Sequence, residues 1–279
     1  MVTAYRANRI LYNFIKSNSI QGEAIVPANL CRSVVDTLYL AGMKLFFVDI
    51  TEDTLCVDDR VVIGRAMDAS LLVFVHTYGI EMSCPIWFST IKKINPGLAI
   101  VDDRCLCLPQ LSLDDCSADL VLFSTCSKKQ VDLGYGGIGY LSEKWEYNEN
   151  IVESNAILTN MVWTPALDLI EDHIRDSALH KEHLNSIYYD CLPSEIQLPK
   201  GFQNWRFNIL VSNKEDILEN LFSTGLFASS HYCSLSDHCS VAVNLHKRIV
   251  NLFNDFYYSE EQAIRTCEVI NNIIRKEND

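Results

Sequence analysis

The sequence has no apolar run that approaches the length of a bilayer-spanning helix, and it has no basic stripe. Its 23 Lys and Arg residues are outnumbered by 36 Asp and Glu residues, which gives a formal net charge of −13. Such a chain repels nucleic acid and anionic lipid, so we expect neither as a partner. The segment 1–18 has arginine and asparagine within its apolar pattern, and we therefore expect no signal peptide.

Cysteine pairs with the spacing of a metal site are also missing. None of the 11 cysteines forms a C-x-x-C pair, and the closest two, Cys105 and Cys107, have the spacing of side chains on one strand. An odd number of cysteines without a secretory segment favours reduced thiols. We expect a cytoplasmic protein without a metal site, in which most cysteines are small buried apolar residues.

Short apolar strands alternate with helices through the first hundred residues. We expect strands at 23–27, 44–49, 70–76 and 98–102, and helices at 5–17, 29–41, 58–66 and 83–94. This alternation is typical of βαβ units, which build a mostly parallel sheet covered on both faces. The sequence therefore predicts an α/β domain, with ligands collected at the carboxyl ends of the strands.

The pattern changes after residue 141. A polar connector is expected at 144–153, followed by one long helix at 164–189. Strands at 205–212 and 225–230, with helices at 214–223 and 259–274, predict a smaller α/β domain. We therefore divide the chain into a large domain at 1–150 and a long connecting helix with a small C-terminal domain at 151–279.

The segment 118–141 carries the most informative residues. A buried strand at 120–123 is followed by Ser124, by the pair Lys128 and Lys129, and by a glycine-dense return strand. Glycines allow the backbone to pass close to a flat ligand, and hydroxyls can bind phosphate. The alternative is a loop with two solvated lysines followed by a hairpin.

Four polar residues fall at predicted strand ends, namely His76, Asp102, Asp103 and Ser124. A pyridine aldehyde cofactor requires an amine, a carboxylate that keeps the ring nitrogen protonated, and donors around its phosphate. Lys129 could be the amine, Asp103 or Asp102 the carboxylate, and Ser124 a phosphate donor. A Mg²⁺ site at the two aspartates, or a helix N-cap at Asp103, are the competing interpretations.

At these residues the sequence resembles the DegT/StrS-type pyridoxal-phosphate-dependent sugar aminotransferases. The matching motifs are Phe123-Ser124 through Lys129 to Gly136-Gly137-Ile138, Val101-Asp102-Asp103, Val75-His76-Thr77-Tyr78-Gly79, Ile25-Val26-Pro27, Ala41-Gly42 and Phe47-Val48-Asp49. The resemblance implies a three-layer large domain of fold type I and pyridoxal 5'-phosphate (PLP) as cofactor. It assigns the Schiff-base lysine to Lys129 and the partner of the pyridinium nitrogen to Asp103.

The resemblance also has departures, all in accessory contacts to the cofactor. The phosphate-binding Ser-Gly-Thr turn of the family is absent, and Arg6 is the residue that could contribute a charge there. Cys31 stands where an aromatic residue often covers the ring, and Leu106 stands where a glutamine commonly meets the cofactor hydroxyl. We expect all three to line the cofactor site.

Substrate contacts are assigned to His76, Arg206 and His231. Arg206 could bind a substrate carboxylate with both of its terminal nitrogens, although a surface arginine is the alternative. The resemblance puts His231 near the mouth of the site, and a structural histidine is the alternative. Asn155 and Asn160 are candidates for contact with the phosphate bound by a neighbouring subunit.

The function expected from these residues is transfer of an amino group from an amino acid such as glutamate to a keto group, on a nucleotide-linked sugar. The resemblance implies a homodimer. Other PLP chemistry on the same fold, such as dehydration or reactions of a small amino acid, is the alternative enzyme function. A non-catalytic binding or regulatory subunit is the alternative outside catalysis.

Overall fold

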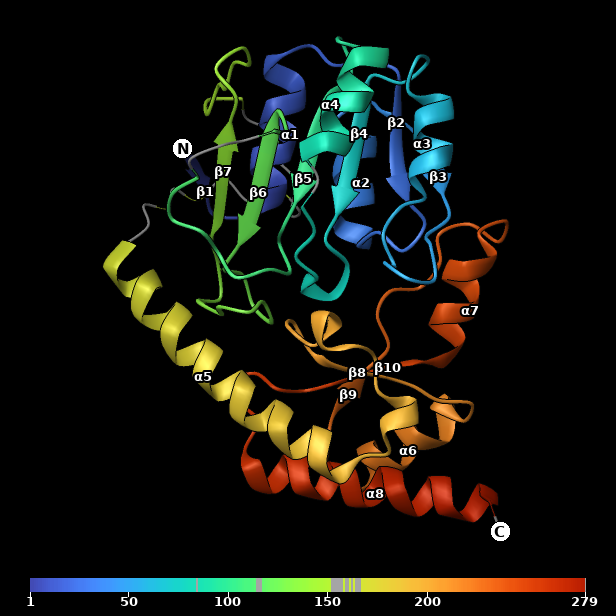
Figure 1. Cartoon of the computed structure of the whole chain (residues 1–279). Helices are drawn as coiled ribbons and strands as arrows, with labels where there is room; N and C mark the ends of the chain where they lie inside the picture. The colour runs from blue at the N-terminus through green and yellow to red at the C-terminus, as the bar shows by residue number, and fades with distance from the viewer. Residues whose placement is uncertain are drawn as a thin grey trace.

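The larger sheet has seven strands in the order β1-β7-β6-β5-β4-β2-β3. The computed structural model describes residues 1–83, 85–113, 117–151, 158, 161, 163 and 167–278 (Figure 1). The strands are β1 (Val2–Ala4), β2 (Glu23–Pro27), β3 (Lys44–Val48), β4 (Leu71–Val75), β5 (Ala99–Asp103), β6 (Leu120–Ser124) and β7 (Gly137–Leu141). All but β1, which the sequence analysis missed, were expected.

The topology brings five strands to a common edge. The five neighbouring strands β3, β2, β4, β5 and β6 are parallel, so their carboxyl ends meet at this edge. Strand β7 is antiparallel to both β6 and β1. Strand β1 therefore runs in the same direction as β6, and Arg6, two residues beyond its end, lies at the same edge. This arrangement places the start of the following helix beside the ends of β5 and β6.

Helices cover both faces of this sheet. The strand residues alternate, since Leu71 and Val73 join the core under α1 (Ala7–Ser17) and α2 (Arg32–Leu40), while Leu72 and Phe74 join the core on the opposite face. That opposite core includes residues of α3 (Asp59–Arg65) and α4 (Pro85–Ile94). The predicted three-layer α/β architecture is confirmed.

The glycines of the return strand serve helix packing. A Cβ at Gly137 would lie 2.4 Å from the backbone nitrogen of Ala7, and one at Gly139 would lie 2.8 Å from Ile10 Cγ2. The start of α1 therefore rests directly on β7. At these two positions the expectation that the glycines admit a flat ligand is wrong, because helix α1 occupies the space.

Replacing Gly137 by alanine is expected to destabilise the fold by roughly 2–3 kcal/mol, because backbone atoms of α1 must shift to admit the methyl group. Urea unfolding measures the loss. Gly64→Ala is the matched control, since a Cβ there meets nothing within 4 Å. A Gly137→Ala protein as stable as this control would contradict the packing described here.

The C-terminal part of the chain has its own antiparallel sheet, in the order β8-β10-β9. Its strands are β8 (Phe207–Leu210), β9 (Ala228–Ser229) and β10 (Ile249–Leu252), and its helices and turns are α5 (Leu167–Cys191), η2 (Ser194–Ile196), η3 (Lys200–Phe202), α6 (Lys214–Ser223), α7 (Ser240–Arg248) and α8 (Glu260–Asn278). Figure 1 shows α5 running from the large sheet to α8. The sequence analysis missed α7 and β10. Within the described ranges, no helix is both long and apolar enough to cross a membrane.

Asp49 joins the two parts of the structure. Its carboxylate, just beyond β3, accepts hydrogen bonds from the backbone amides of Val241 (2.9 Å) and Ala242 (3.0 Å) in the first turn of α7. Cys239, the N-cap residue of α7, forms no side-chain cap. Asp49 therefore supplies from the large sheet the cap that α7 lacks, and it fixes α7 beside the end of β3.

Candidate active site

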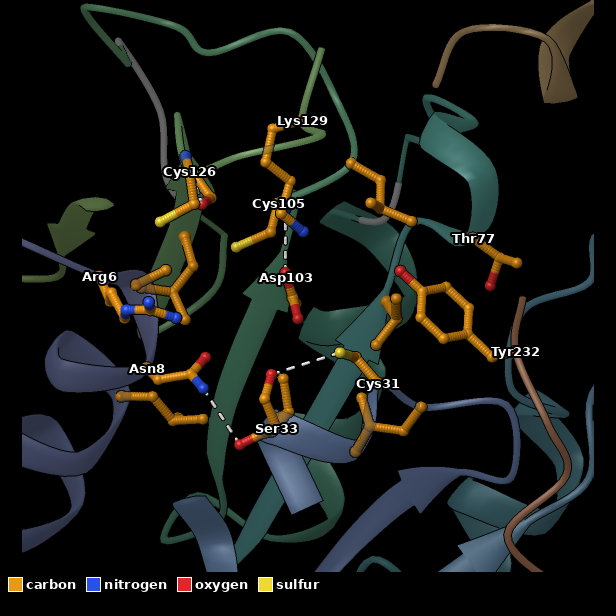
Figure 2. A pocket seen from close by; sticks show the side chains of 18 of the residues that line it. Arg6, Asn8, Cys31, Ser33, Thr77, Asp103, Cys105, Cys126, Lys129 and Tyr232 are labelled. Carbon is orange, nitrogen blue, oxygen red and sulfur yellow. Dashed lines mark hydrogen bonds between the residues drawn. The ribbon is translucent and has the colours of Figure 1, made fainter. Parts of the chain in front are cut away.

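A cavity of about 270 Å³ lies at the carboxyl edge of the large sheet. It is bordered by the ends of β4, β5 and β6, by the starts of α1 and α2, and by Tyr232 from the C-terminal part of the chain. Figure 2 shows the side chains that surround this space. The predicted cofactor residues all line it, namely Arg6, Cys31, Asp103, Leu106, Ser124 and Lys129.

Lys129 and Asp103 reach the cavity from neighbouring strands. Asp103 is the last residue of β5 and is buried, and one carboxylate oxygen accepts a hydrogen bond from the amide of Cys105 at 2.9 Å. Lys129 follows β6 on a turn, and Figure 2 shows its side chain extending into the cavity toward Asp103. Among the described residues, the Lys129 ammonium group forms no hydrogen bond or ion pair.

The start of α1 forms another wall. Arg6, at the N-cap, makes no side-chain cap, and the first turn of α1 has no acidic residue. The amide of Arg9 donates to the carbonyl of Arg6 at 3.0 Å, and the preceding amides, which come too early in a helix to have a partner within it, favour an anion. Arg6 and Asn8 line the cavity there, and Asn8 Nδ2 donates to the carbonyl of Ser33 at 3.1 Å. This end of the cavity is suited to a phosphate group.

Ser124 lines the cavity between the pair Lys129 and Asp103 and the start of α1. Its hydroxyl donates to the carbonyl of Gly136 and accepts from the amide of Cys126, both at 3.3 Å. Bonds of this length are weak, so a ligand oxygen could replace the Gly136 carbonyl after rotation of the hydroxyl.

The two adjacent aspartates have different environments. Asp102 is buried on the other side of β5, where it accepts from His76 Nε2 and from Arg104 Nε, each at 2.7 Å. The other ring nitrogen of His76 faces the carbonyl of Ile80 at 2.8 Å. The Mg²⁺ interpretation of the aspartate pair is wrong, because only Asp103 lines the cavity. His76, a predicted substrate contact, is buried outside the cavity lining.

Arg206 is likewise outside the cavity lining. Its side chain is buried, with Nη1 2.5 Å from an Asp255 carboxylate oxygen and the guanidinium 3.7 Å from the centre of the Phe253 ring. Burial lowers the pKa of Arg206, and Asp255 opposes that shift. The expectation of a surface or substrate-binding arginine is corrected, because its charge is already paired.

His231 does not line the cavity, but its neighbour Tyr232 does. The pKa of His231 is lowered, first by desolvation and then by the positive charges of Arg206, Lys128 and Lys129. At neutral pH the ring is therefore kept uncharged.

The sequence analysis missed several lining residues, among them Asn8, Thr77, Cys105, Cys126 and Tyr232. Tyr232 comes from a loop after β9, and nothing in its local pattern indicates its position. Burial raises the pKa of Tyr232 well above its usual value, and the nearby Cys31 and Asp103 contribute. Burial and the charge of Asp103 also raise the pKa of Cys105. Both side chains therefore face the cavity in their neutral forms.

No family model and no curated protein sequence matches the chain. The similarity is one of structure. A DegT DnrJ EryC1 StrS aminotransferase from Brucella abortus is 15% identical, with a TM-score of 0.74 over 98% of this chain and 85% of its own. Spr1654 from Streptococcus pneumoniae, assigned as a sugar aminotransferase and solved in a PMP form, is 14% identical, with a TM-score of 0.77 over 99% of this chain and 88% of its own.

The sugar aminotransferase CalS13 from Micromonospora echinospora is 13% identical, with a TM-score of 0.72 over 97% of this chain and 86% of its own. The chain has the fold of these aminotransferases. The resemblance seen in the sequence is thereby confirmed for the fold. Spr1654 was also solved in a PLP form. Asn155 and Asn160 lie outside the described residues.

Proposed function

We propose that this protein is a PLP-dependent aminotransferase that acts on a sugar. The observation that carries the proposal is the cavity at the sheet edge, where the amine of Lys129, which pairs with no residue that the structure describes, extends toward a buried carboxylate, Asp103. The fold shared with sugar aminotransferases supports it, since one of those proteins was solved with and without an amino group on its cofactor.

The donor set of the cavity fits PLP. Asp103 is an acceptor for a protonated ring nitrogen, and the uncapped start of α1 with Arg6 is a cationic end for the phosphate. PLP, when bound, supplies an aldehyde that combines with an amine and a ring that withdraws electrons. A cavity of about 270 Å³ has room for a group of this size.

The protein residues would have separate tasks. Lys129 would hold the aldehyde carbon and then carry a proton between its Nζ atom and the reacting substrate carbon. Asp103 would keep the proton on the ring nitrogen, because its negative charge is buried beside it. Tyr232, with its pKa raised, would close the small-domain side as a neutral phenol.

The finer assignments are proposals as well. The resemblance supports glutamate as the amino donor, a nucleotide-linked keto sugar as the acceptor, and a homodimer. It also supports the division at residue 150, since the two sheets lie on either side of it. Every cysteine that the structure describes is a free thiol, which suits a cytoplasmic protein.

Spectroscopy on purified protein incubated with PLP tests the proposal. We expect a visible absorption band, its loss on borohydride reduction, and a pyridoxyl group on the tryptic peptide that contains Lys129. Addition of glutamate should convert the cofactor to its amino form in a single turnover. A protein that stays colourless and unlabelled would overturn the proposal.

The second candidate is a subunit that binds PLP without turning it over. The observation that favours it is the composition of the cavity wall, where the side chain of Leu106 has no hydrogen-bonding group and that of Cys31 has no ring. Cys31 Sγ lies 3.3 Å from the hydroxyl of Ser33. A cofactor that binds to Lys129 but accepts no amino group from any donor would support this candidate.

A further inference from the structure

The residue before Lys129 has a backbone conformation that L-amino acids rarely adopt. Lys128 has a φ of 65°, in the left-handed region, where the Cβ atom crowds the carbonyl group. For a residue other than glycine this conformation is disfavoured by roughly tenfold. It sets the direction in which the chain leaves the turn, and therefore the direction from which Lys129 enters the cavity.

Two hydrogen bonds hold Lys128 in this conformation. Its amide donates to an Asp132 carboxylate oxygen at 2.7 Å, and its carbonyl accepts from the indole Nε1 of Trp205 at 2.8 Å. Asp132 belongs to the same turn and also accepts from the amide of Gly134 at 2.8 Å. Trp205 lies 77 residues further along the chain, just before β8. It connects the lysine turn to the small domain.

The indole of Trp205 is itself fixed. It is buried, and its ring is stacked with that of Tyr78 at a centroid distance of 6.3 Å and with that of Tyr232 at 6.1 Å, with interplanar angles of 6° and 15°. The backbone amide of Trp205 donates to the carbonyl of Tyr78 at 3.2 Å. The ring cannot turn without breaking both stacks, so its N–H group is held toward Lys128.

We propose that Trp205 is a positioning residue for Lys129, which acts by holding the Lys128 carbonyl and so keeping the turn in the conformation that directs the amine toward Asp103. This inference rests on the proposed function, because it assigns the amine a bound aldehyde. Trp205 does not line the cavity and acts only through the turn. Since its partner in the stack, Tyr232, does line the cavity, the same indole joins the lysine to the small-domain wall.

Trp205→Phe tests the proposal, because phenylalanine keeps a ring in the stack and removes the N–H group. Loss of this hydrogen bond lowers the population of the competent turn, and we expect the dissociation constant for PLP to rise roughly three- to tenfold. The fraction of Lys129 that borohydride labels at a limiting PLP concentration should fall in parallel. Both are measured on apo-protein without turnover.

Trp145→Phe is the matched control. The indole of Trp145 donates to Asp119 at 2.7 Å, so the substitution removes an equivalent N–H bond away from the cavity. We expect this variant to lose stability and to keep its affinity for PLP. Equal PLP affinity in the two tryptophan variants would overturn the positioning role.

Lys128→Gly supplies a rescue that a merely structural tryptophan would not show. Glycine adopts the left-handed conformation without crowding, so Lys128→Gly combined with Trp205→Phe should restore PLP affinity, whereas Lys128→Ala should not. Asp132→Ala removes the other bond to Lys128 and should show the same loss and the same rescue, even if Trp205→Phe fails to fold. Absence of rescue in both backgrounds would contradict the proposal.

The wild-type protein separates this inference from the proposed function. Without a pyridoxyl group at Lys129 in the wild-type protein, both are overturned. With that group present and with unchanged affinity in Trp205→Phe and Asp132→Ala, only the positioning role is overturned.

Discussion

Replacing Lys129 by alanine is expected to abolish covalent binding of PLP and to lower the rate of amino transfer by on the order of 10⁴-fold, the upper end of what a positioned acid–base group contributes. Figure 2 shows the side chain of Lys129 extending toward Asp103. Absorption spectra and borohydride labelling measure binding, and single-turnover assays with glutamate measure the rate.

Lys128→Ala is the control for this change. Its backbone is in the same turn, but its side chain is exposed and does not line the cavity. We expect it to retain the pyridoxyl label at Lys129 after reduction. The wrong lysine would have been assigned if the pyridoxyl label of the wild-type protein is found on Lys128, or if the Lys129→Ala protein still transfers amino groups.

Asp103→Asn is the prediction with the second largest effect. The amide is nearly the same size as the carboxylate but carries no charge, so it cannot keep a proton on the ring nitrogen. We expect amino transfer to slow by on the order of 10²- to 10³-fold, as for loss of one electrostatic group in a water-excluded site. PLP should still bind to Lys129, because the amine and the phosphate end of the cavity are unchanged.

For Asp102→Asn we expect a loss of stability and not a loss of activity. Asp102 holds His76 and Arg104 outside the cavity lining, so its neutralisation leaves the buried imidazole of His76 and the half-buried guanidinium of Arg104 with a weaker acceptor. We expect lower stability in urea unfolding, together with a normal cofactor spectrum. Should Asp102→Asn lose the cofactor while Asp103→Asn keeps both cofactor and rate, the assignment of the two carboxylates would be reversed.

The contrast between these aspartates shows where sequence reasoning reached its limit. The pattern of an apolar strand followed by two acids places both residues at the sheet edge, but it leaves open which of them faces the ligand. Adjacent residues of a strand point to opposite faces. The cavity lies on the face of the sheet that α1 covers, because the start of α1 forms one of its walls. Val101 and Asp103 of β5 point to that face, and Asp102 points to the other.

Arg206 and the return-strand glycines illustrate the same limit. From the sequence, Arg206 could bind a substrate carboxylate. In the structure its guanidinium donates instead to Asp255, which is 49 residues away along the chain. The glycines of the return strand allow either a ligand or another chain segment to lie against the backbone, and at Gly137 and Gly139 that segment is α1. Contacts between distant segments decide such questions, and local patterns do not contain them.

The sequence by itself determined the parallel α/β sheet, because strand and helix periods alternate, and it determined that Asp103, Ser124 and Lys129 meet at one edge, because parallel strands end together. Only the tertiary structure decided that Tyr232 closes the cavity, that Asp49 caps α7 and that Trp205 holds the lysine turn. Each of these contacts joins the C-terminal part of the chain to the part that holds the large sheet, and its geometry depends on how the two parts pack.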